Sequence, residues 1–237
     1  MQKIILTGAT GGLGKALVDV IGEHDSNELV CVYRNEEKFT ALREKHTDLT
    51  GYKLSKEDNF EELFATICHE DIDKIVLILN AFSISPIKKI GDMKAEEIGA
   101  SVYGNVVRNY LLVNETVRYC KANALGLRII NLDSGAADHS LMGWGNYCAS
   151  KAFMNSLLSV VACENPEYQI VSVDPGVMDT DMQAEIRAVK QDVFEQVDTF
   201  INYKKSGLLK APETVAKQIA DKYLYDWTAK SMREKLR

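Results

Sequence analysis

Three residues in the second half of the chain have the types and spacing needed for acid–base chemistry. Tyr147 and Lys151 stand four residues apart, which places them on one face of a helix, and Ser134 precedes Tyr147 by thirteen residues. An ammonium group beside a phenol favours the phenolate, so Lys151 is expected to lower a tyrosine pKa that is about 10 when unperturbed. Tyr147 is therefore the candidate acid or base, with Ser134 as a candidate partner.

Spacing alone does not identify this pair, because Tyr52 and Lys56 repeat it. Tyr147 opens a long predicted helix, whereas Tyr52 lies in a predicted strand. Ser134 also follows the predicted strand 127–132, and open α/β sheets bind ligands beyond the carboxyl ends of their strands. These features favour the later pair. The alternative is a surface Tyr–Lys pair beside an unrelated serine.

A glycine-rich loop lies at the start of the chain, between a predicted strand and a predicted helix. Residues 7–14 read Thr-Gly-Ala-Thr-Gly-Gly-Leu-Gly. Glycines let the backbone turn tightly and approach a pyrophosphate, and the following helix offers free N–H groups and its positive dipole end. The position of the loop predicts a dinucleotide-binding site. The alternative is a tight strand–helix turn that binds nothing.

The end of the second predicted strand indicates which dinucleotide binds. NAD-binding proteins place an acidic residue there, about 20 residues past the glycine loop, for the ribose 2′-hydroxyl. Here Tyr33 occupies that position and Arg34 follows it, with no carboxylate before Glu36. A guanidinium suits a 2′-phosphate, so the sequence predicts NADPH. An exposed arginine without a ligand is the alternative.

The elements that would position these residues alternate regularly. Short β-branched runs are separated by stretches with helical spacing, and runs such as 75–79 are apolar without alternation, as in strands buried on both faces. This pattern predicts a single α/β domain over 1–237, a Rossmann-like doubly wound parallel sheet of six to seven strands with helices on both faces. The strands are expected at 3–6, 29–33, 51–54, 74–79, 127–132 and 170–173, and the helices at 12–22, 36–46, 56–69, 95–123 and 146–165.

Composition narrows the class of protein further. The 237 residues are 46% hydrophobic and 26% charged with a net charge of −6, which argues against nucleic acid or a membrane as partner. No run reaches the roughly 20 apolar residues of a membrane span, and no signal peptide is recognisable. The four histidines show no metal-ligand spacing. The five cysteines (31, 68, 120, 148 and 163) are interpreted as reduced and mostly buried, and the expected location is cytoplasmic.

Together these residues resemble the short-chain dehydrogenase/reductase family, over residues 2 to about 183. Residues 79–82 (Leu-Asn-Ala-Phe) are similar to the family's Asn-Asn-Ala-Gly. Asn105 matches the asparagine whose backbone carbonyl holds a relay water, and 175–180 match the segment that holds the nicotinamide carboxamide.

The resemblance implies an NADPH-dependent carbonyl reductase that transfers hydride to a ketone. In that family Tyr147 would donate the proton, Ser134 would hold the carbonyl oxygen, Lys151 would lower the tyrosine pKa and bind the ribose, and Asn105 would support proton resupply. The expected cofactor-binding residues are Gly8, Thr10, Gly11, Gly12, Leu13, Gly14, Arg34, Leu54, Asn80, Ala81, Tyr147, Lys151, Pro175, Gly176, Val177 and Thr180.

Three stretches look like the branch that contains sepiapterin reductase and bacterial benzil reductase: 134–137, 143–152 and 179–183. Both reduce a ketone next to another carbonyl, which implies a 1,2-dicarbonyl or pterin side-chain substrate. The expected pocket residues are Trp144, Met142, Met178 and Met182. Core packing is the alternative for Trp144.

The segment 179–206, with Phe194 and Phe200, is interpreted as a substrate lid, and plain helix packing is its alternative. Three departures from the family pattern stand out. Phe82 replaces a glycine near the cofactor, Lys53 replaces an aspartate near the adenine, and 228–237 lack the closing glycine-rich strand, so a seventh strand is expected to be missing or frayed.

The expected partners are a small carbonyl substrate and further copies of the chain. A homodimer or homotetramer would pair through the helices at 95–123 and 146–165, as the resemblance implies. Two other functions stay open from the sequence: a non-catalytic NADP(H)-binding sensor, and an alcohol dehydrogenase that works in the oxidative direction.

Overall fold

The computed structural model describes residues 2–236 except 25–26, 48, 56–57 and 68–71. Its centre is a parallel sheet with the strand order β3-β2-β1-β4-β5-β6-β7. The strands are β1 (Gln2–Thr7), β2 (Asn27–Tyr33), β3 (Thr50–Lys53), β4 (Lys74–Leu79), β5 (Gly126–Leu132), β6 (Gln169–Asp174) and β7 (Arg233–Lys235). The order reverses between β1 and β4, and such a switch point is where open α/β sheets bind ligands.

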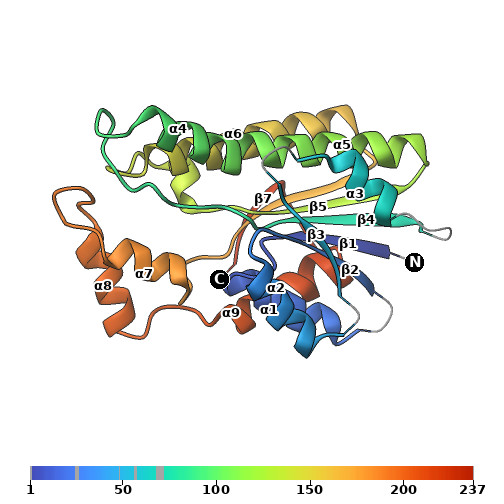
Figure 1. Cartoon of the computed structure of the whole chain (residues 1–237), viewed down its shortest axis with the longest axis horizontal. Coiled ribbons are helices and arrows are strands. Elements are labelled where there is room, and N and C mark those ends of the chain that lie inside the picture. The colour runs from blue at the N-terminus through green and yellow to red at the C-terminus, as the bar shows by residue number, and fades with distance from the viewer. Residues whose placement is uncertain (1, 25–26, 48, 56–57, 68–71, 237) are drawn as a thin grey trace.

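Helices cover both faces of the sheet (Figure 1). On one face lie α1 (Gly12–Gly22), α2 (Glu36–Lys45) and α9 (Pro212–Ile219), and on the other α3 (Phe60–Ile67), α4 (Ala95–Val102), α5 (Arg108–Ala122) and α6 (Gly145–Glu164). Beyond the carboxyl edge of the strands stand α7 (Asp181–Arg187) and α8 (Val197–Lys205).

Strand β4 shows why the sheet needs both layers. Val76 and Ile78 pack into the core beneath α1 and α9, while Ile75, Leu77 and Leu79 pack into the core beneath α3, α5 and α6. All five side chains are essentially inaccessible to solvent. A strand with no polar face is stable only between two helical layers, because burial of apolar surface is the main favourable contribution to folding.

The expected fold class is confirmed, and the predicted strands match within one or two residues. The helix predicted at 95–123 is divided, because a π-helical turn, Tyr103–Val107, joins α4 to α5. The helix predicted at 56–69 begins only at Phe60 and ends at Ile67. Its outermost predicted residues, with Lys56 and Cys68 among them, lie outside the described residues.

The carboxyl terminus forms a short seventh strand, where the sequence predicted six to seven strands and expected the seventh to be missing or frayed. Residues Arg233–Lys235 form a short strand parallel to β6, with Ser172 opposite Arg233 and Asp174 opposite Lys235. The strand follows a π-helical turn, Ala220–Tyr225, which closes the α9 layer. Three residues suffice because side chains hold the strand in place: the Tyr223 hydroxyl donates to Glu234 at 2.6 Å.

Candidate active site

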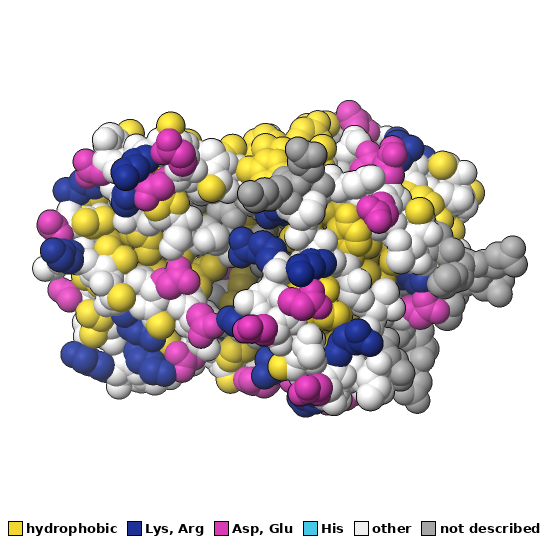
Figure 2. Space-filling view, viewed as in Figure 1, with side chains coloured by type: hydrophobic (Ala, Val, Ile, Leu, Met, Phe, Trp, Pro, Cys, Tyr) yellow, Lys and Arg dark blue, Asp and Glu magenta, His cyan; other side chains and the backbone are white. Residues whose placement is uncertain are grey.

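A cavity of about 680 Å³ opens at the carboxyl edge of the sheet. Its walls are the glycine loop before α1, the end of β2, the segment after β4, the α4–α5 junction and the start of α7. The face in Figure 2 is hollowed between α7–α8 and the rest of the molecule, and basic side chains lie beside the hollow. The cavity therefore lies where the fold predicts a ligand.

The glycine loop is shaped by close approaches of its own backbone. Gly8 has a φ of +68°, which favours glycine. A Cβ on Gly14 would lie 2.0 Å from the Gly8 oxygen, and one on Gly12 would lie 2.6 Å from Thr180. Gly11 is the N-cap of α1 and makes no side-chain hydrogen bond, so the N–H groups of the first turn receive no bond from the cap. The loop fits a pyrophosphate, since its backbone can approach a ligand closely.

The predicted loop residues divide into two groups. Gly8, Gly11 and Gly12, together with Thr10 and Leu13, line the cavity, whereas Gly14 does not line it. Gly14 instead lets the helix pack against the loop.

The sequence interpretation missed Thr7, which ties this loop to β4. Its hydroxyl oxygen accepts hydrogen bonds from the backbone N–H groups of Asn80 and Ala81 at 2.9 and 3.0 Å. The Asn80 amide donates in return to the backbone oxygens of Thr7 and Gly8 at 3.2 and 3.1 Å. Asn80 and Ala81 also line the cavity, so these two predicted residues help to build it.

The end of β2 presents unpaired positive charge to the cavity. Arg34 and Lys38 line it, and neither side chain has an ion-pair partner among the described residues. Glu36, the first carboxylate after β2, is instead held by Lys53 at 3.0 Å and by the Tyr33 hydroxyl at 3.2 Å. Lys53, which departs from the family's aspartate, thus compensates the negative charge of Glu36.

The structure brings Ser134, Tyr147 and Lys151 together at the carboxyl end of β5. The Lys151 ammonium donates to the Leu132 backbone oxygen at 2.5 Å, and Tyr147 forms a hydrogen bond with Ser134. Burial raises the pKa of Tyr147 to about 12, although the bond to Ser134 acts in the opposite direction. Burial also lowers the pKa of Lys151 to about 7, against the opposing effect of Asp133 and other acidic groups.

These directions differ from the sequence expectation. Lys151 was expected to lower the pKa of Tyr147, but burial is the largest effect on both groups. Burial disfavours the charged form, which is the phenolate for tyrosine and the ammonium for lysine. In this state Tyr147 is a protonated phenol at neutral pH, which is the form that can donate a proton.

Phe82 stands between this set and the cavity. Its ring centre lies 3.2 Å from the Lys151 Nζ. Phe82 lines the cavity, whereas Ser134, Tyr147 and Lys151 do not. The residue that departs from the family's glycine therefore covers the lysine.

Asn105 lies in the π-helical turn between α4 and α5 and lines the cavity. Its side chain holds the segment after β4, because Oδ1 accepts from the Ser83 N–H at 2.9 Å and Nδ2 donates to the Ser83 oxygen at 2.8 Å. Its backbone oxygen accepts a hydrogen bond from the Asn109 side chain at 2.9 Å. These bonds tie the π-helical turn to the segment after β4 and to α5.

The segment after β6 reaches the cavity only in part. Met178 and Thr180 line it, together with Leu54 after β3, whereas Pro175, Gly176 and Val177 do not. Gly176 has a φ of +79°, and its N–H donates to Asp174 Oδ1 at 2.9 Å. The Val177 oxygen accepts from the Lys210 N–H at 3.0 Å.

The four expected pocket residues also divide. Met178 and Met182 line the cavity, whereas Trp144 and Met142 do not. Trp144 is buried, stacked on Phe194 with ring centres 4.6 Å apart and set edge-on to Tyr147 at 5.7 Å. Trp144 thus packs in an aromatic cluster outside the cavity wall, and Met142 is exposed.

The segment 179–206 packs against that same aromatic cluster. Phe194 is buried and Phe200 lies 5.5 Å from the Trp144 ring. The segment also contacts the far wall of the cavity, since the Ser85 hydroxyl donates to Glu185 of α7 at 2.9 Å. Sequence reasoning missed the polar lining here, and nothing in the spacing of these residues indicates it. The polar wall residues are Ser83, Ser85, Glu97, Ser101, Arg108 and Glu185.

No described helix is long and apolar enough to cross a membrane. No group of three or more histidine, cysteine or acidic side chains within the described ranges could hold a metal ion. Cys31, Cys120, Cys148 and Cys163 form no disulfide with one another. Cys31 and Cys120 are buried, and Cys163 is exposed.

Comparison with known proteins gives concordant results. The family model described as short chain dehydrogenase matches residues 2–191. Benzil reductase ((S)-benzoin forming) of Bacillus cereus is 33% identical over 92% of this chain and 92% of its own. Sepiapterin reductase of Bos taurus is 30% identical over 79% of this chain and 77% of its own. A short chain dehydrogenase/reductase structure from Saccharomyces cerevisiae superposes with a TM-score of 0.86, at 24% identity over 99% of this chain and 96% of its own.

Proposed function

Because the chain belongs to the short chain dehydrogenase family, we propose that it is an NADPH-dependent carbonyl reductase that converts a ketone to an alcohol. The observation that carries the proposal is the convergence of Ser134, Tyr147 and Lys151 beside a cavity that the glycine loop and Arg34 line. The loop supplies close backbone approach, and Arg34 supplies an uncompensated positive charge.

The cofactor-binding residues have distinct roles in this proposal. Gly8, Thr10, Gly11, Gly12 and Leu13 hold the pyrophosphate, while Gly14 shapes their loop. Arg34 holds the 2′-phosphate, and Leu54 flanks the adenine. Asn80 and Ala81 support the loop. Thr180, which lines the cavity, and the segment Pro175, Gly176 and Val177 behind it would hold the nicotinamide. NADPH, when bound, supplies the hydride.

The remaining steps belong to the side chains. Tyr147 donates its proton to the substrate oxygen as that oxygen gains negative charge, since its raised pKa keeps it protonated. Ser134 holds the same oxygen by a hydrogen bond. Lys151 can take up a proton near neutral pH and so places a positive charge beside Tyr147. Asn105 fixes the segment after β4 through its bonds to Ser83. These groups act mainly by position and electrostatics.

The substrate in this proposal is a ketone with an adjacent carbonyl group. The names of the two curated relatives support that class, and Met178 and Met182 give the cavity wall adaptable apolar surface. The test is a screen of NADPH oxidation at neutral pH with benzil, sepiapterin, diacetyl and simple aldehydes. Turnover of dicarbonyls supports the proposal, and NADPH binding without any turnover would indicate a sensor. Turnover only of alcohols with NADP⁺ would indicate a dehydrogenase.

The active unit in this proposal is a homodimer or homotetramer. Helices α4, α5 and α6 lie on one face of the molecule (Figure 1) and carry several exposed apolar side chains. They are Ile98, Val102, Tyr110, Leu111, Phe153 and Val160. A second copy of the chain that covers this face would remove them from water.

A further inference from the structure

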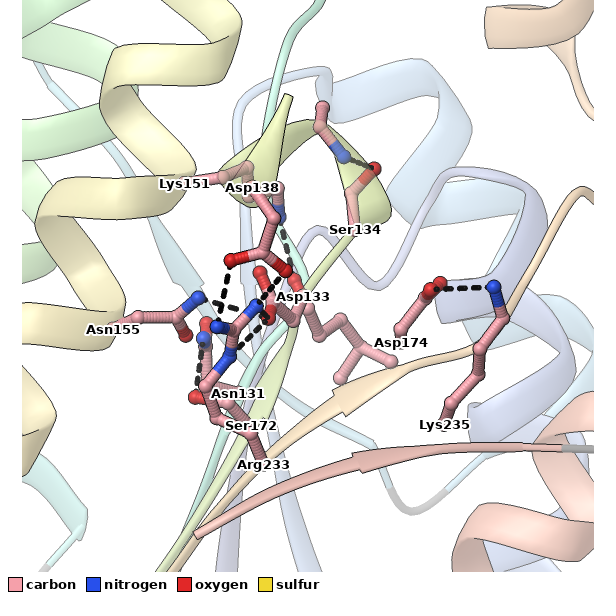
Figure 3. Close-up of polar contacts among 12 residues, drawn as sticks. Asn131, Asp133, Ser134, Asp138, Lys151, Asn155, Ser172, Asp174, Arg233 and Lys235 are labelled. Atoms are coloured by element: carbon pink, nitrogen blue, oxygen red, sulfur yellow. Dashed lines mark hydrogen bonds and ion pairs between the residues drawn. The ribbon is translucent and has the colours of Figure 1, made fainter. Parts of the chain in front are cut away.

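Arg233, on the last strand, forms hydrogen bonds to both ends of the segment that carries Ser134. Arg233 donates from Nε and Nη2 to the Asp133 carboxylate at 3.3 and 3.1 Å, and from Nη1 and Nη2 to the Asp138 carboxylate at 2.8 and 2.7 Å (Figure 3). Asp133 comes directly before Ser134, and Asp138 ends the 3₁₀ turn Gly135–Asp138 that follows it. One guanidinium thus joins the two ends of a six-residue segment.

Asp133 connects the Arg233 hydrogen bonds to the surroundings of Lys151. Its carboxylate is 2% exposed and also accepts a hydrogen bond from Asn155 at 2.9 Å. Asn155 lies one helical turn after Lys151 on α6, and the Lys151 ammonium donates to Leu132, the residue before Asp133. Figure 3 shows these side chains converging from β5, α6 and β7. Asp133 therefore lies where three elements meet.

Other contacts hold the segment at its start and middle: the Asp133 N–H donates to the Val173 oxygen at 2.8 Å, and Ala136 is buried. Ser134 is in extended conformation, and its Oγ accepts from the Ala136 N–H at 3.2 Å. A single 3₁₀ turn has few hydrogen bonds of its own. Charge-assisted bonds from a planar guanidinium fix direction as well as distance. Arg233 supplies four of them.

We propose that Arg233 is a positioning residue for the reaction: it fixes Ser134 opposite Tyr147 and balances the buried charge of Asp133 beside Lys151. The positional part rests on the proposed function, whereas the electrostatic part does not. The short strand β7, which the sequence indicated as missing or frayed, thereby acquires a role in the site.

The charges around Lys151 predict how its pKa changes when the Arg233 guanidinium is removed. The charged and titratable groups around Lys151 are Asp133, Asp138, Tyr147, Cys148, Asp174, Arg233 and Lys235. Asp133 and Asp174 favour the Lys151 ammonium, and Arg233 offsets the first of them. Removal of the guanidinium leaves Asp133 uncompensated, so the pKa of Lys151 should rise from about 7 by roughly half a unit to one unit.

The experiment compares Arg233→Met and Asp138→Asn with the wild type. Asp138→Asn weakens the exposed part of these Arg233 hydrogen bonds while leaving the buried Asp133 in place, so it tests the proposal even if Arg233→Met folds poorly. Arg118→Met is the matched control, because Arg118 also bridges two carboxylates, Glu61 and Glu115, far from the site. Each variant is assayed for kcat and KM by NADPH oxidation, for Tm, and for the Lys151 pKa by NMR titration of ¹³Cε-labelled lysine.

The proposal expects Arg233→Met to lower kcat by about tenfold or more, with little change in the KM for NADPH, because misplacement acts on the chemical step. Asp138→Asn should lower kcat by less. It removes a negative charge and leaves Arg233 paired with Asp133 alone, so the Lys151 pKa should fall slightly rather than rise. Arg118→Met should change neither kcat nor the Lys151 pKa. A lower Tm with unchanged kcat and unchanged Lys151 pKa would overturn the proposal. If the wild type reduces no ketone, the proposed function fails, and the lysine titration still decides whether Arg233 balances Asp133.

Discussion

The ring of Phe82 lies against the Lys151 ammonium, with Nζ 3.2 Å from the ring centre. The ring faces the cavity and the ammonium does not, so Phe82 is the cover of a buried lysine. Any group that is to contact Lys151 from the cavity must displace this ring. The contact exists because Phe82 stands where the family has glycine. A glycine at this position would leave no ring to displace.

Replacement of Phe82 by glycine should strengthen NADPH binding. Contact between an ammonium and an aromatic ring contributes about 1 kcal/mol, so removing the need to break it should lower the Kd about fivefold. Fluorescence titration with NADPH measures the change. Phe82→Leu, which keeps an apolar cover without the ring, should fall between the two. Weaker binding by the glycine variant would show that the ring stacks on the cofactor.

Tyr147→Phe should reduce ketone turnover by about 10²–10⁴-fold while NADPH still binds. The substitution removes the hydroxyl that donates the proton and keeps the buried ring against Trp144. Steady-state kinetics and a binding titration separate the two effects. Tyr52→Phe is the matched control, because the Tyr52 hydroxyl donates to the Asn59 backbone and lies outside the cavity. A Tyr147→Phe enzyme with more than a tenth of the wild-type kcat contradicts the role of Tyr147.

Arg34→Ala should raise the KM for NADPH at least tenfold and leave the KM for NADH nearly unchanged. A charge-assisted hydrogen bond contributes about 1.5–3 kcal/mol, which corresponds to roughly 10–150-fold. Kinetics with both cofactors measures the ratio. Arg43→Ala, on the same side of the molecule but outside the cavity wall, is the control. Preference of the wild type for NADH would show that this interpretation of Arg34 is wrong.

Lys151 should make the stability of the protein depend on pH. Its pKa is about 7 in the folded protein and 10.5 in the unfolded chain, so between these values the unfolded chain binds more protons. The contribution of Lys151 to the free energy of unfolding therefore increases as pH rises from 7 towards 10.5, and it is at its lowest below pH 7. Urea unfolding of the wild type and of Lys151→Met from pH 6.5 to 9.5 tests this. Parallel pH dependences for the two proteins would contradict the lowered pKa.

The exposed apolar face on α4, α5 and α6 should be an interface between copies of the chain. Val160, which is 50% exposed on α6, becomes a buried charge in such a dimer when replaced by lysine. Light scattering should give the wild type at least twice the 26.5 kDa of one chain, and Val160→Lys a larger monomer fraction. Leu208→Lys, at an exposed position outside these helices, should leave the mass unchanged. A wild-type mass near 26.5 kDa at micromolar concentration would refute the interface.

The sequence by itself determined the parallel sheet and the place of the glycine loop within it. Continuous apolar runs such as β4 and the glycine loop before α1 report local requirements, burial on two faces and a tight backbone turn, that a linear pattern carries. The four-residue spacing of Tyr147 and Lys151 likewise follows from helix geometry alone. These predictions depended on neighbours in sequence, and the structure agrees with them.

The tertiary structure decided which side chains face the cavity and which charges survive burial. Trp144 packs on Phe194, which belongs to the segment 179–206. Arg233 forms hydrogen bonds to Asp133, which precedes it by 100 residues in the chain. No local pattern encodes such contacts, because the free energy of each depends on surfaces that only folding brings together. The pKa directions of Tyr147 and Lys151 have the same origin, since desolvation depends on every element packed around the pair rather than on the residue type.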